Sequence, residues 1–276
     1  MKKLFILLLA SAFVFAACSN GNSKAKDDTP EPRTEVTGKL GKYGSPYEVG
    51  DILFNDGSAT PYTAQLTLTD EQKAAAIALI FYKDTGLNNG DDTTTIRTLG
   101  VGLKHSSGLA WCKNEANAHS RDITTIQESD KNGSDNLEQI AAFLTSNSSI
   151  NDTGIASNYP AFYFAKNYKD LKIGSETVSR ISAGSEYSSG WYLPSIAELD
   201  QIYVNGKGTN KVFDIDSASN LCDGDQFGSS YYWSSSQHAS NTSNTSACSL
   251  SFGSGGKSNF YKQNTSNFVC AIREFN

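Results

Sequence analysis

Two stretches frame the C-terminal part of this chain: Tyr231-Tyr232-Trp233-Ser234-Ser235-Ser236 and Phe268-Val269-Cys270-Ala271-Ile272-Arg273-Glu274-Phe275. The sequence between them is rich in small polar residues, as in 241–246 (NTSNTS) and 253–256 (GSGG), and it contains no acidic residue. Loops that a rigid scaffold holds for recognition tolerate such sequence. Ser, Asn, Gly and Tyr are also the residues of adaptable binding loops. The framed segment therefore favours a recognition surface over a catalytic site.

A third stretch, Gly190-Trp191-Tyr192-Leu193-Pro194-Ser195-Ile196-Ala197-Glu198-Leu199, leads into a predicted helix over 195–203. We expect Glu198 to bind the helix start or another backbone donor. We expect Arg273 of the last stretch to partner a carboxylate. Buried positions are predicted at four residues of these stretches: Trp191, Leu193, Trp233 and Ile272.

The rest of the chain gives a mixed pattern. Thr69 and Gln72 predict a capped helix over 69–80, although the apolar run 77–82 could instead be a buried strand. Further helices are predicted over 135–144 and 159–168, and strands over 51–54, 99–103, 108–111, 231–235, 248–252 and 268–275. Because helices come first and strands last, the order predicts an α+β fold rather than βαβ units.

The N-terminus carries an export signal. Two lysines precede the apolar run 4–15, which is too short to span a bilayer, and small residues precede Cys18. This arrangement resembles a bacterial lipobox, so we expect residues 1–17 to be a lipoprotein signal peptide and Cys18 to be lipidated. The alternative is an ordinary secretory peptide. Residues 18–46 are polar and predict a flexible tether, followed by a domain over 47–276.

Net charge and cysteine spacing limit the classes of function that this chain can have. The net charge of −6 argues against nucleic-acid binding. Cys112, Cys222, Cys248 and Cys270 are too irregularly spaced to fix disulfide pairs, and Cys270 is expected to be a buried small hydrophobe.

Enzyme motifs are absent from the sequence. The three histidines occur in no His-Glu-x-x-His pattern, and no paired CxxC occurs. We therefore expect no enzyme activity, no cofactor and no metal site. Calcium at the acidic runs 214–216 and 223–225 stays an open alternative.

The three framing stretches together resemble a pattern in the formylglycine-generating-enzyme-like branch of the C-type lectin fold. Residues 49–57 and 108–111 are also similar to bacterial lipoproteins of this type. The resemblance implies a few helices packed on short, mostly antiparallel strands with long loops. The catalytic cysteine motif of the enzymes is missing, so their activity is not implied.

A narrower resemblance is to the variable lipoproteins of diversity-generating retroelements, of the Treponema variable protein type. It is carried by the Y-W-S-S-S-Q start, the Ser/Asn/Thr-rich filling and the fixed final strand. In that family a reverse transcriptase miscopies adenines, so that Asn codons change into others. The resemblance implies that about 231–276 is diversified to bind varied protein or glycan targets. It also implies lipid anchoring to a bacterial membrane, with display at the outer membrane and cell surface.

Candidate contact residues follow from this resemblance, and they are expected on one face of the domain. The aromatic anchors would be Phe260, Tyr261 and Phe268. The full set is His238, Cys248, Ser249, Ser251, Ser254, Gly256, Ser258, Phe260, Tyr261, Asn264 and Phe268. The alternatives are an exported enzyme of the formylglycine-generating type and a structural lipoprotein without a ligand.

Overall fold

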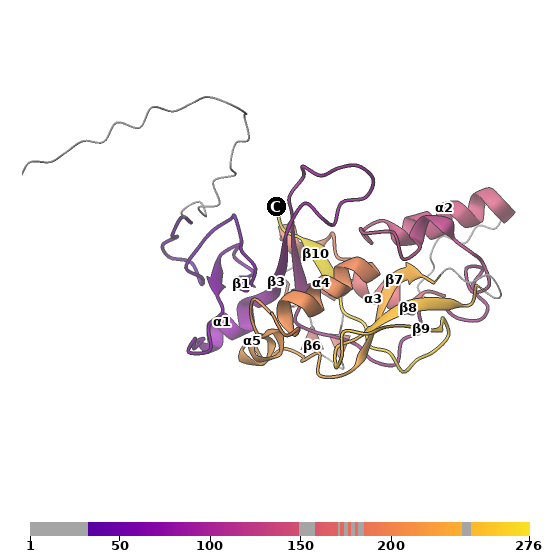
Figure 1. Cartoon of the computed structure of the whole chain (residues 1–276). Coiled ribbons are helices and arrows are strands. Elements are labelled where there is room, and N and C mark those ends of the chain that lie inside the picture. The colour runs from indigo at the N-terminus through magenta and orange to yellow at the C-terminus, as the bar shows by residue number, and fades with distance from the viewer. Residues whose placement is uncertain are drawn as a thin grey trace, which may run out of the picture. The chain divides into compact units, whose positions relative to one another are not determined.

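Antiparallel strands form the centre of the structure, a computed structural model that describes residues 33–148, 158–170, 172–173, 176–177, 180–181, 185–238 and 244–276 (Figure 1). The central sheet has the strand order β10-β4-β3-β1-β2. Its strands are Ile272–Glu274, Arg97–Gly102, Ala76–Asp84, Asp51–Phe54 and Ala59–Pro61, in that order. A second sheet has the order β7-β8-β9, from Tyr231–Gln237, Ser246–Ser251 and Lys257–Tyr261. Lys172–Ile173 (β5) and Glu176–Thr177 (β6) form a short pair.

Short helices surround the sheets. The α-helices are Asp70–Ala75 (α1), Asn136–Ser148 (α2), Pro160–Lys166 (α3), Ile196–Gly206 (α4) and Ile215–Leu221 (α5). Three 3-10 turns lie at Thr124–Ile126 (η1), Tyr168–Asp170 (η2) and Glu186–Ser188 (η3). Helices and antiparallel sheets in one unit confirm the α+β class. Among the described residues, no helix has the length and apolar character needed to cross a bilayer.

The folded unit begins at Arg33, earlier than the boundary at residue 47 that the sequence predicts. Arg33 donates to the buried carboxylate of Asp51, and Tyr43 forms a bridge with Ala59, the first residue of β2. Residues 33–46 are therefore part of the fold, and the tether prediction is wrong for them. The predicted signal peptide, Cys18 and the rest of the predicted tether lie outside the described residues.

The apolar run after Thr69 changes from helix to strand. Thr69 and Gln72 form a complete capping box, but α1 ends at Ala75 and β3 starts at the next residue. Pairing of β3 with β1 and β4 stabilises the strand. An amphipathic helix over the same residues would leave part of this apolar run exposed to solvent. The strand alternative for 77–82 is confirmed.

The central sheet separates two hydrophobic cores. Alternate strand residues point to opposite faces, so Leu53 and Ile80 join one core while Ile52 and Phe81 join the other. The four predicted core residues of the framing stretches are confirmed as buried: Trp191, Leu193, Trp233 and Ile272. The predicted burial of Cys270 is confirmed as well.

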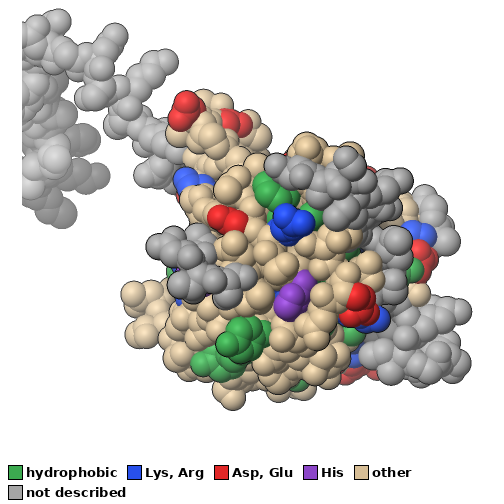
Figure 2. Space-filling view, turned by 90° about the vertical axis from the view of Figure 1, so that its right-hand side faces the viewer, with side chains coloured by type: hydrophobic (Ala, Val, Ile, Leu, Met, Phe, Trp, Pro, Cys, Tyr) green, Lys and Arg blue, Asp and Glu red, His purple; other side chains and the backbone are tan. Residues whose placement is uncertain are grey.

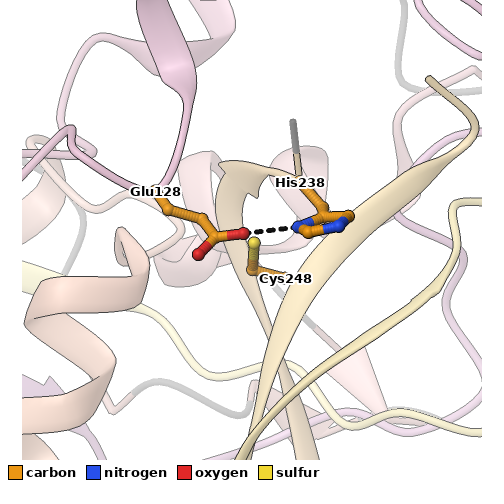
Figure 3. Close-up of side chains that lie close together, drawn as sticks. All are labelled: Glu128, His238 and Cys248. Atoms are coloured by element: carbon orange, nitrogen blue, oxygen red, sulfur yellow. Dashed lines mark hydrogen bonds and ion pairs between the residues drawn. The ribbon is translucent and has the colours of Figure 1, made fainter. Parts of the chain in front are cut away.

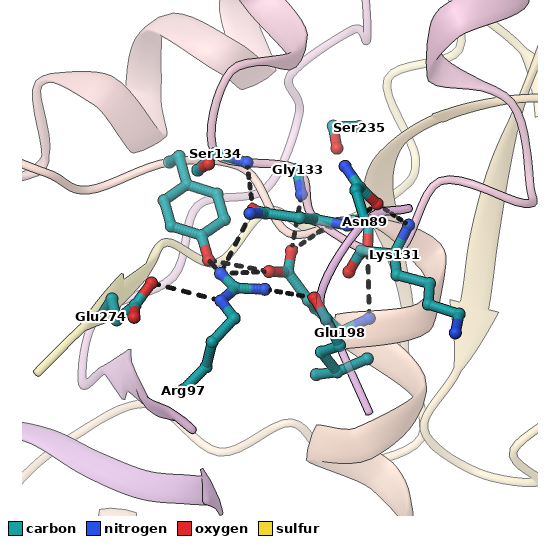
Figure 4. A network of polar contacts seen from close by, with 12 residues as sticks. Asn89, Arg97, Lys131, Gly133, Ser134, Glu198, Ser235 and Glu274 are labelled. Atoms are coloured by element: carbon teal, nitrogen blue, oxygen red, sulfur yellow. Dashed lines mark hydrogen bonds and ion pairs between the residues drawn. The ribbon is translucent and has the colours of Figure 1, made fainter. Parts of the chain in front are cut away.

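A buried ion pair links β4 to the stretch 190–199 (Figure 4). Arg97 Nη2 lies 3.0 Å from Glu198 Oε1, with side chains 3% and 0% exposed. Glu198 also accepts hydrogen bonds from the backbone N–H groups of Ser195 and Gly133, and from the Tyr192 hydroxyl. The expected role of Glu198 is confirmed. Burial raises the pKa of Glu198, while Arg97 opposes the rise.

The serines of β7 connect the second sheet to the helix start. Ser234 Oγ donates to Cys248 O, Ser235 Oγ accepts from Asn136 Nδ2, and Ser236 Oγ accepts from Ile196 N–H. All three serines are completely buried. Their hydroxyls satisfy polar groups that burial would otherwise leave unpaired, so small hydroxyl side chains are required here.

Two sequence expectations are wrong. Residues 108–111 form no strand; instead the Trp233 indole donates to Leu109 O, and the Trp111 indole donates to Ser234 O. Arg273 donates to the backbone carbonyls of Ser189, Glu186 and Glu274 rather than to a carboxylate. Residues 257–261 form the edge strand β9, although the predicted strands do not include them.

The ion pair gives a stability prediction. Arg97→Met should lower the free energy of unfolding by about 3–5 kcal/mol, because Glu198 loses its countercharge in a dry site. Urea unfolding monitored by circular dichroism measures the change. The double variant Arg97→Met/Glu198→Gln should regain part of the loss, since the neutral amide no longer needs a cation. A loss below about 1 kcal/mol for Arg97→Met would contradict this reading.

Candidate functional site

The second sheet, β7–β9, is buried along β7 and β8 and exposed along β9. Residues Lys257, Asn259 and Tyr261 of β9 are exposed, while Ser258 and Phe260 between them are half-buried. The strand pairs with β8 on one side only, and no other described strand pairs with its free edge. Side chains of β9 and its two flanking loops are therefore available for contact with a partner.

The predicted contact residues lie on two faces rather than one. Cys248 is directly opposite Asn259, and Ser249 is directly opposite Ser258. Directly opposed residues share a face, and successive residues alternate between faces. Cys248 and Asn259 therefore point to one face, and Ser249 and Ser258 to the other. The predicted contact residues thus alternate between the two faces of this sheet.

Three predicted contact residues are inaccessible. Cys248, Ser249 and Ser251 are at most 6% exposed, because β8 lies between β7 and β9. Ser249 Oγ instead accepts a hydrogen bond from the buried Asn267 side chain. The accessible positions, which we call the display surface, are His238, Ser254, Gly256, Ser258, Phe260, Tyr261, Asn264 and Phe268.

The three proposed aromatic anchors differ in exposure. Tyr261 is 63% exposed. Phe260 is half-buried, with its ring 5.1 Å from that of Tyr231, which is itself 38% exposed. Phe268 is also half-buried, and its backbone bonds to Tyr231 and Trp233. Tyr261 and Phe260 fit the anchor role best, and Tyr231 is an accessible aromatic that the sequence prediction missed.

The β8–β9 hairpin is held in place by helix α4. Gly255 has φ +72°, and a Cβ there would lie 2.4 Å from the Tyr203 ring. Glycine is therefore required at Gly255, while Ser254 and Gly256 on either side are exposed. Lys257 at the start of β9 lies 3.6 Å from Asp200 of α4. The hairpin therefore carries exposed side chains that can be substituted, on a backbone that α4 holds in place.

Figure 2 shows the side of the molecule that lies at the right of Figure 1, where α2 and the ends of β8 and β9 are. Its hydrophobic side chains form separate patches, and charged side chains of both signs are scattered among them. Such a surface suits recognition by fit and aromatic burial more than by long-range charge.

Lys262, directly after β9, is fully buried. Its Nζ donates to Ala118 O at 2.7 Å and lies 5.0 Å from the centre of the Trp111 ring. Burial lowers the pKa of Lys262 to about 8, only partly offset by the Cys112 and Asp122 side chains. Lys262 is thus a structural residue and not part of the display surface.

Glu128 brings an acidic group to the second sheet (Figure 3). His238 Nδ1 and Glu128 Oε1 are 2.5 Å apart, and the ligand atoms of these two residues and of Cys248 all lie within 4.8 Å of one another. Burial raises the pKa of the Cys248 thiol, and Glu128 adds to the rise. His238 and Cys248 were predicted as contact residues, but nothing in the sequence links them to Glu128.

A separate cleft of about 450 Å³ contains none of the predicted contact residues in its lining. Its lining comes from α2, α3 and residues 188–193, including Leu137, Phe162 and Trp191. Glu138 and Lys166, which form an ion pair, also line the cleft.

The acidic runs that left calcium open have structural roles here. Asp214 caps α5 and pairs with Lys211, and Asp216 pairs with Lys207. Asp225 accepts from the backbone of His105. His105 itself is buried, and its Nδ1 hydrogen-bonds the Tyr232 hydroxyl.

Comparison with known proteins gives one similarity in fold. No family model and no curated protein matches the chain. A solved structure described as a fimbrial protein from Bacteroides ovatus ATCC 8483 superposes with a TM-score of 0.52 at 16% identity. The match covers 83% of this chain and 49% of that chain, so this chain spans about half the length of the fimbrial protein. At this identity the likeness concerns the fold alone.

The buried lysine generates a pH prediction. Between about pH 8 and the ordinary lysine pKa of 10.5, the unfolded chain holds a proton that folded Lys262 has released. Stability from this group therefore rises with pH across that interval. Relative to Lys262→Met, wild type should gain up to about 3 kcal/mol from pH 8 to 10.5.

Urea unfolding at pH 7.5, 9 and 10.5 measures that difference. Lys257→Met, on the exposed edge strand, controls for the loss of a lysine charge. A difference between wild type and Lys262→Met that does not change with pH would contradict the assignment.

Proposed function

We propose that this chain is a surface-displayed binding lipoprotein with a C-type lectin-like fold of the formylglycine-generating-enzyme type. Its display surface contacts a protein or glycan. The observation that carries the proposal is the contrast within 231–276: residues 232–236 and 269–272 are buried, whereas the hairpin and β9 expose small polar side chains and Tyr261. That contrast is what a fixed scaffold with an adaptable recognition surface requires.

The chemistry of the surface favours a broad, shallow partner. The exposed aromatics Tyr231 and Tyr261 supply contact area, and serine, asparagine and glycine around them supply hydrogen bonds and fit. The positive charge of Lys257 in this area is balanced by Asp200, which lies 3.6 Å away. A protein or glycan surface offers matching groups, whereas nucleic acid calls for a basic face.

Diversification by a retroelement is the second part of the proposal. It rests on the sequence resemblance, and the fold agrees with it in one respect. Replacing the side chains at Ser254, Gly256, Tyr261 and Asn264 leaves the serine contacts of β7 untouched. Cys248, Ser249 and Ser251 do not have this freedom, because they are packed between neighbouring strands.

The enzyme alternative gains no support from the described cysteines. All four are buried. Burial raises the pKa of Cys222 to about 12 and also raises the pKa values of Cys248 and Cys270. A reactive cysteine needs the opposite, a lowered pKa at an accessible position.

Binding is tested with two variants of the purified protein. The first replaces the exposed residues Ser254, Gly256 and Tyr261 with different polar and aromatic residues. The second makes the same number of changes at exposed positions outside β7–β9 and α4, such as Ile96 and Val212. Both are compared with wild type in selections against arrayed bacterial surface proteins and glycans, with a chelator present throughout.

The first variant should lose or change the targets of wild type, and the second should keep them. Thermal melts of both should stay close to wild type, since exposed substitutions cost within about 0.5 kcal/mol. If the first variant keeps every target at unchanged affinity, the display surface is not the binding site.

The proposed anchor has its own test. Cys18→Ser should abolish labelling with palmitate and shift the protein from the detergent phase to the aqueous phase in a phase-partition assay, because stable anchoring needs acyl chains. Ser19→Ala is the matched control and should partition as wild type does. Unchanged partitioning of Cys18→Ser would contradict lipidation.

A further inference from the structure

Backbone pairing brings Glu128 and His238 together. Gln127 forms a parallel bridge with Gln237, so the next residue of each segment lies beside the other. The Gln237 side chain secures this arrangement. It donates to Arg121 O at 2.8 Å, and it accepts from Ile123 N–H at 3.2 Å. Glu128 and His238 are therefore held near one another by a buried network.

Cys248 completes the cluster from the neighbouring strand. His238 N–H donates to Ser246 O at 3.3 Å, which fixes the end of β7 against the start of β8. Cys248 follows two residues later and points to the same face as Ser246. Ser234 Oγ holds the Cys248 carbonyl at 2.8 Å. The three side chains thus come from segments fixed by hydrogen bonds at the backbone.

The donor set is a thiol, an imidazole and a carboxylate. These are the three ligand types that bind zinc in proteins, at about 2.0–2.3 Å from the ion. Tetrahedral ligands at such distances lie about 3.5 Å apart, and the donor atoms here are already within 4.8 Å of one another. His238 and Glu128 are 33% and 49% exposed, so their side chains are free to close the remaining distance onto the fixed, buried Cys248.

We propose that Glu128, His238 and Cys248 form a site for a divalent transition metal, with zinc the ion that suits the donor set best. Binding replaces the thiol proton: the sulfur forms a bond to the metal, and the proton passes to solvent. Thiolate and carboxylate together balance the charge of the ion. Three protein ligands leave the fourth tetrahedral position for water or for a donor from a bound partner. The site rests on contacts within this chain and does not depend on the binding function proposed above.

Cobalt(II) is a suitable probe because its bond to a thiolate gives a charge-transfer absorption band. The full-length protein, freed of metal by a chelator and then dialysed, is titrated with cobalt chloride and afterwards with zinc chloride. We expect the band to saturate at one equivalent of cobalt and to disappear as zinc displaces it. Wild type should also melt at a higher temperature with zinc than without it.

Variants assign the ligands. Cys248→Ser should lose the band, and His238→Ala and Glu128→Gln should each weaken zinc binding at least tenfold by calorimetry. Cys222→Ser, which removes another buried thiol, should keep the band. His238 is partly exposed, so His238→Ala remains informative if Cys248→Ser does not fold. Absence of a thiolate band, loss of the band in Cys222→Ser, or zinc binding unchanged in His238→Ala would overturn the proposal and leave a hydrogen-bonded triad.

Discussion

The buried ion pair between Arg97 and Glu198 is the constraint on which the rest of this structure depends. Two charged groups without solvent are costly unless each is paired and fully hydrogen-bonded. Arg97 of β4 meets this requirement through Glu198, Glu274 and Asn132, and Glu198 meets it through three further donors. The pair therefore fixes the start of α4, the last strand and the loop before α2 relative to one another.

The second sheet is attached to this centre through buried hydroxyls. Ser235 N–H donates to Pro194 O, and Ser236 Oγ accepts from Ile196 N–H at the start of α4. The three framing stretches thus form one connected structure in the fold, although they are far apart in the sequence. None of these contacts involves the exposed side chains of β9, so a change there leaves the scaffold intact.

Local signals in the sequence predicted much of this scaffold. The capping boxes at Thr69 and Ser195, the buried tryptophans and the role of Glu198 follow from short-range patterns. The alternation in β9 was missed because Lys257 to Tyr261 lacks an apolar periodicity and depends on pairing with β8. The ordering of residues 33–46 likewise depends on distant partners, such as Asp51 for Arg33.

Of the candidate site, sequence reasoning found the segment but not its division between surface and interior. Composition cannot tell that Ser249 packs between strands whereas Ser254 lies at a hairpin tip, because both are serines in similar surroundings. Nothing in the sequence indicates that Glu128 lies near His238, because the Gln127–Gln237 bridge that brings them together is a long-range contact. His238 is the one proposed metal ligand on the display surface that is proposed to vary, so the metal site would belong to this variant.

Sequencing the gene and its surroundings in several isolates tests the central claim of a fixed scaffold with a diversified surface most directly. The account predicts a neighbouring reverse-transcriptase gene and a near-copy of the final coding stretch that differs at adenines. Amino-acid differences among isolates should gather at exposed positions of 231–276, with Tyr232, Trp233 and Ser235 unchanged. Differences spread evenly over the chain, with no template copy nearby, would contradict it.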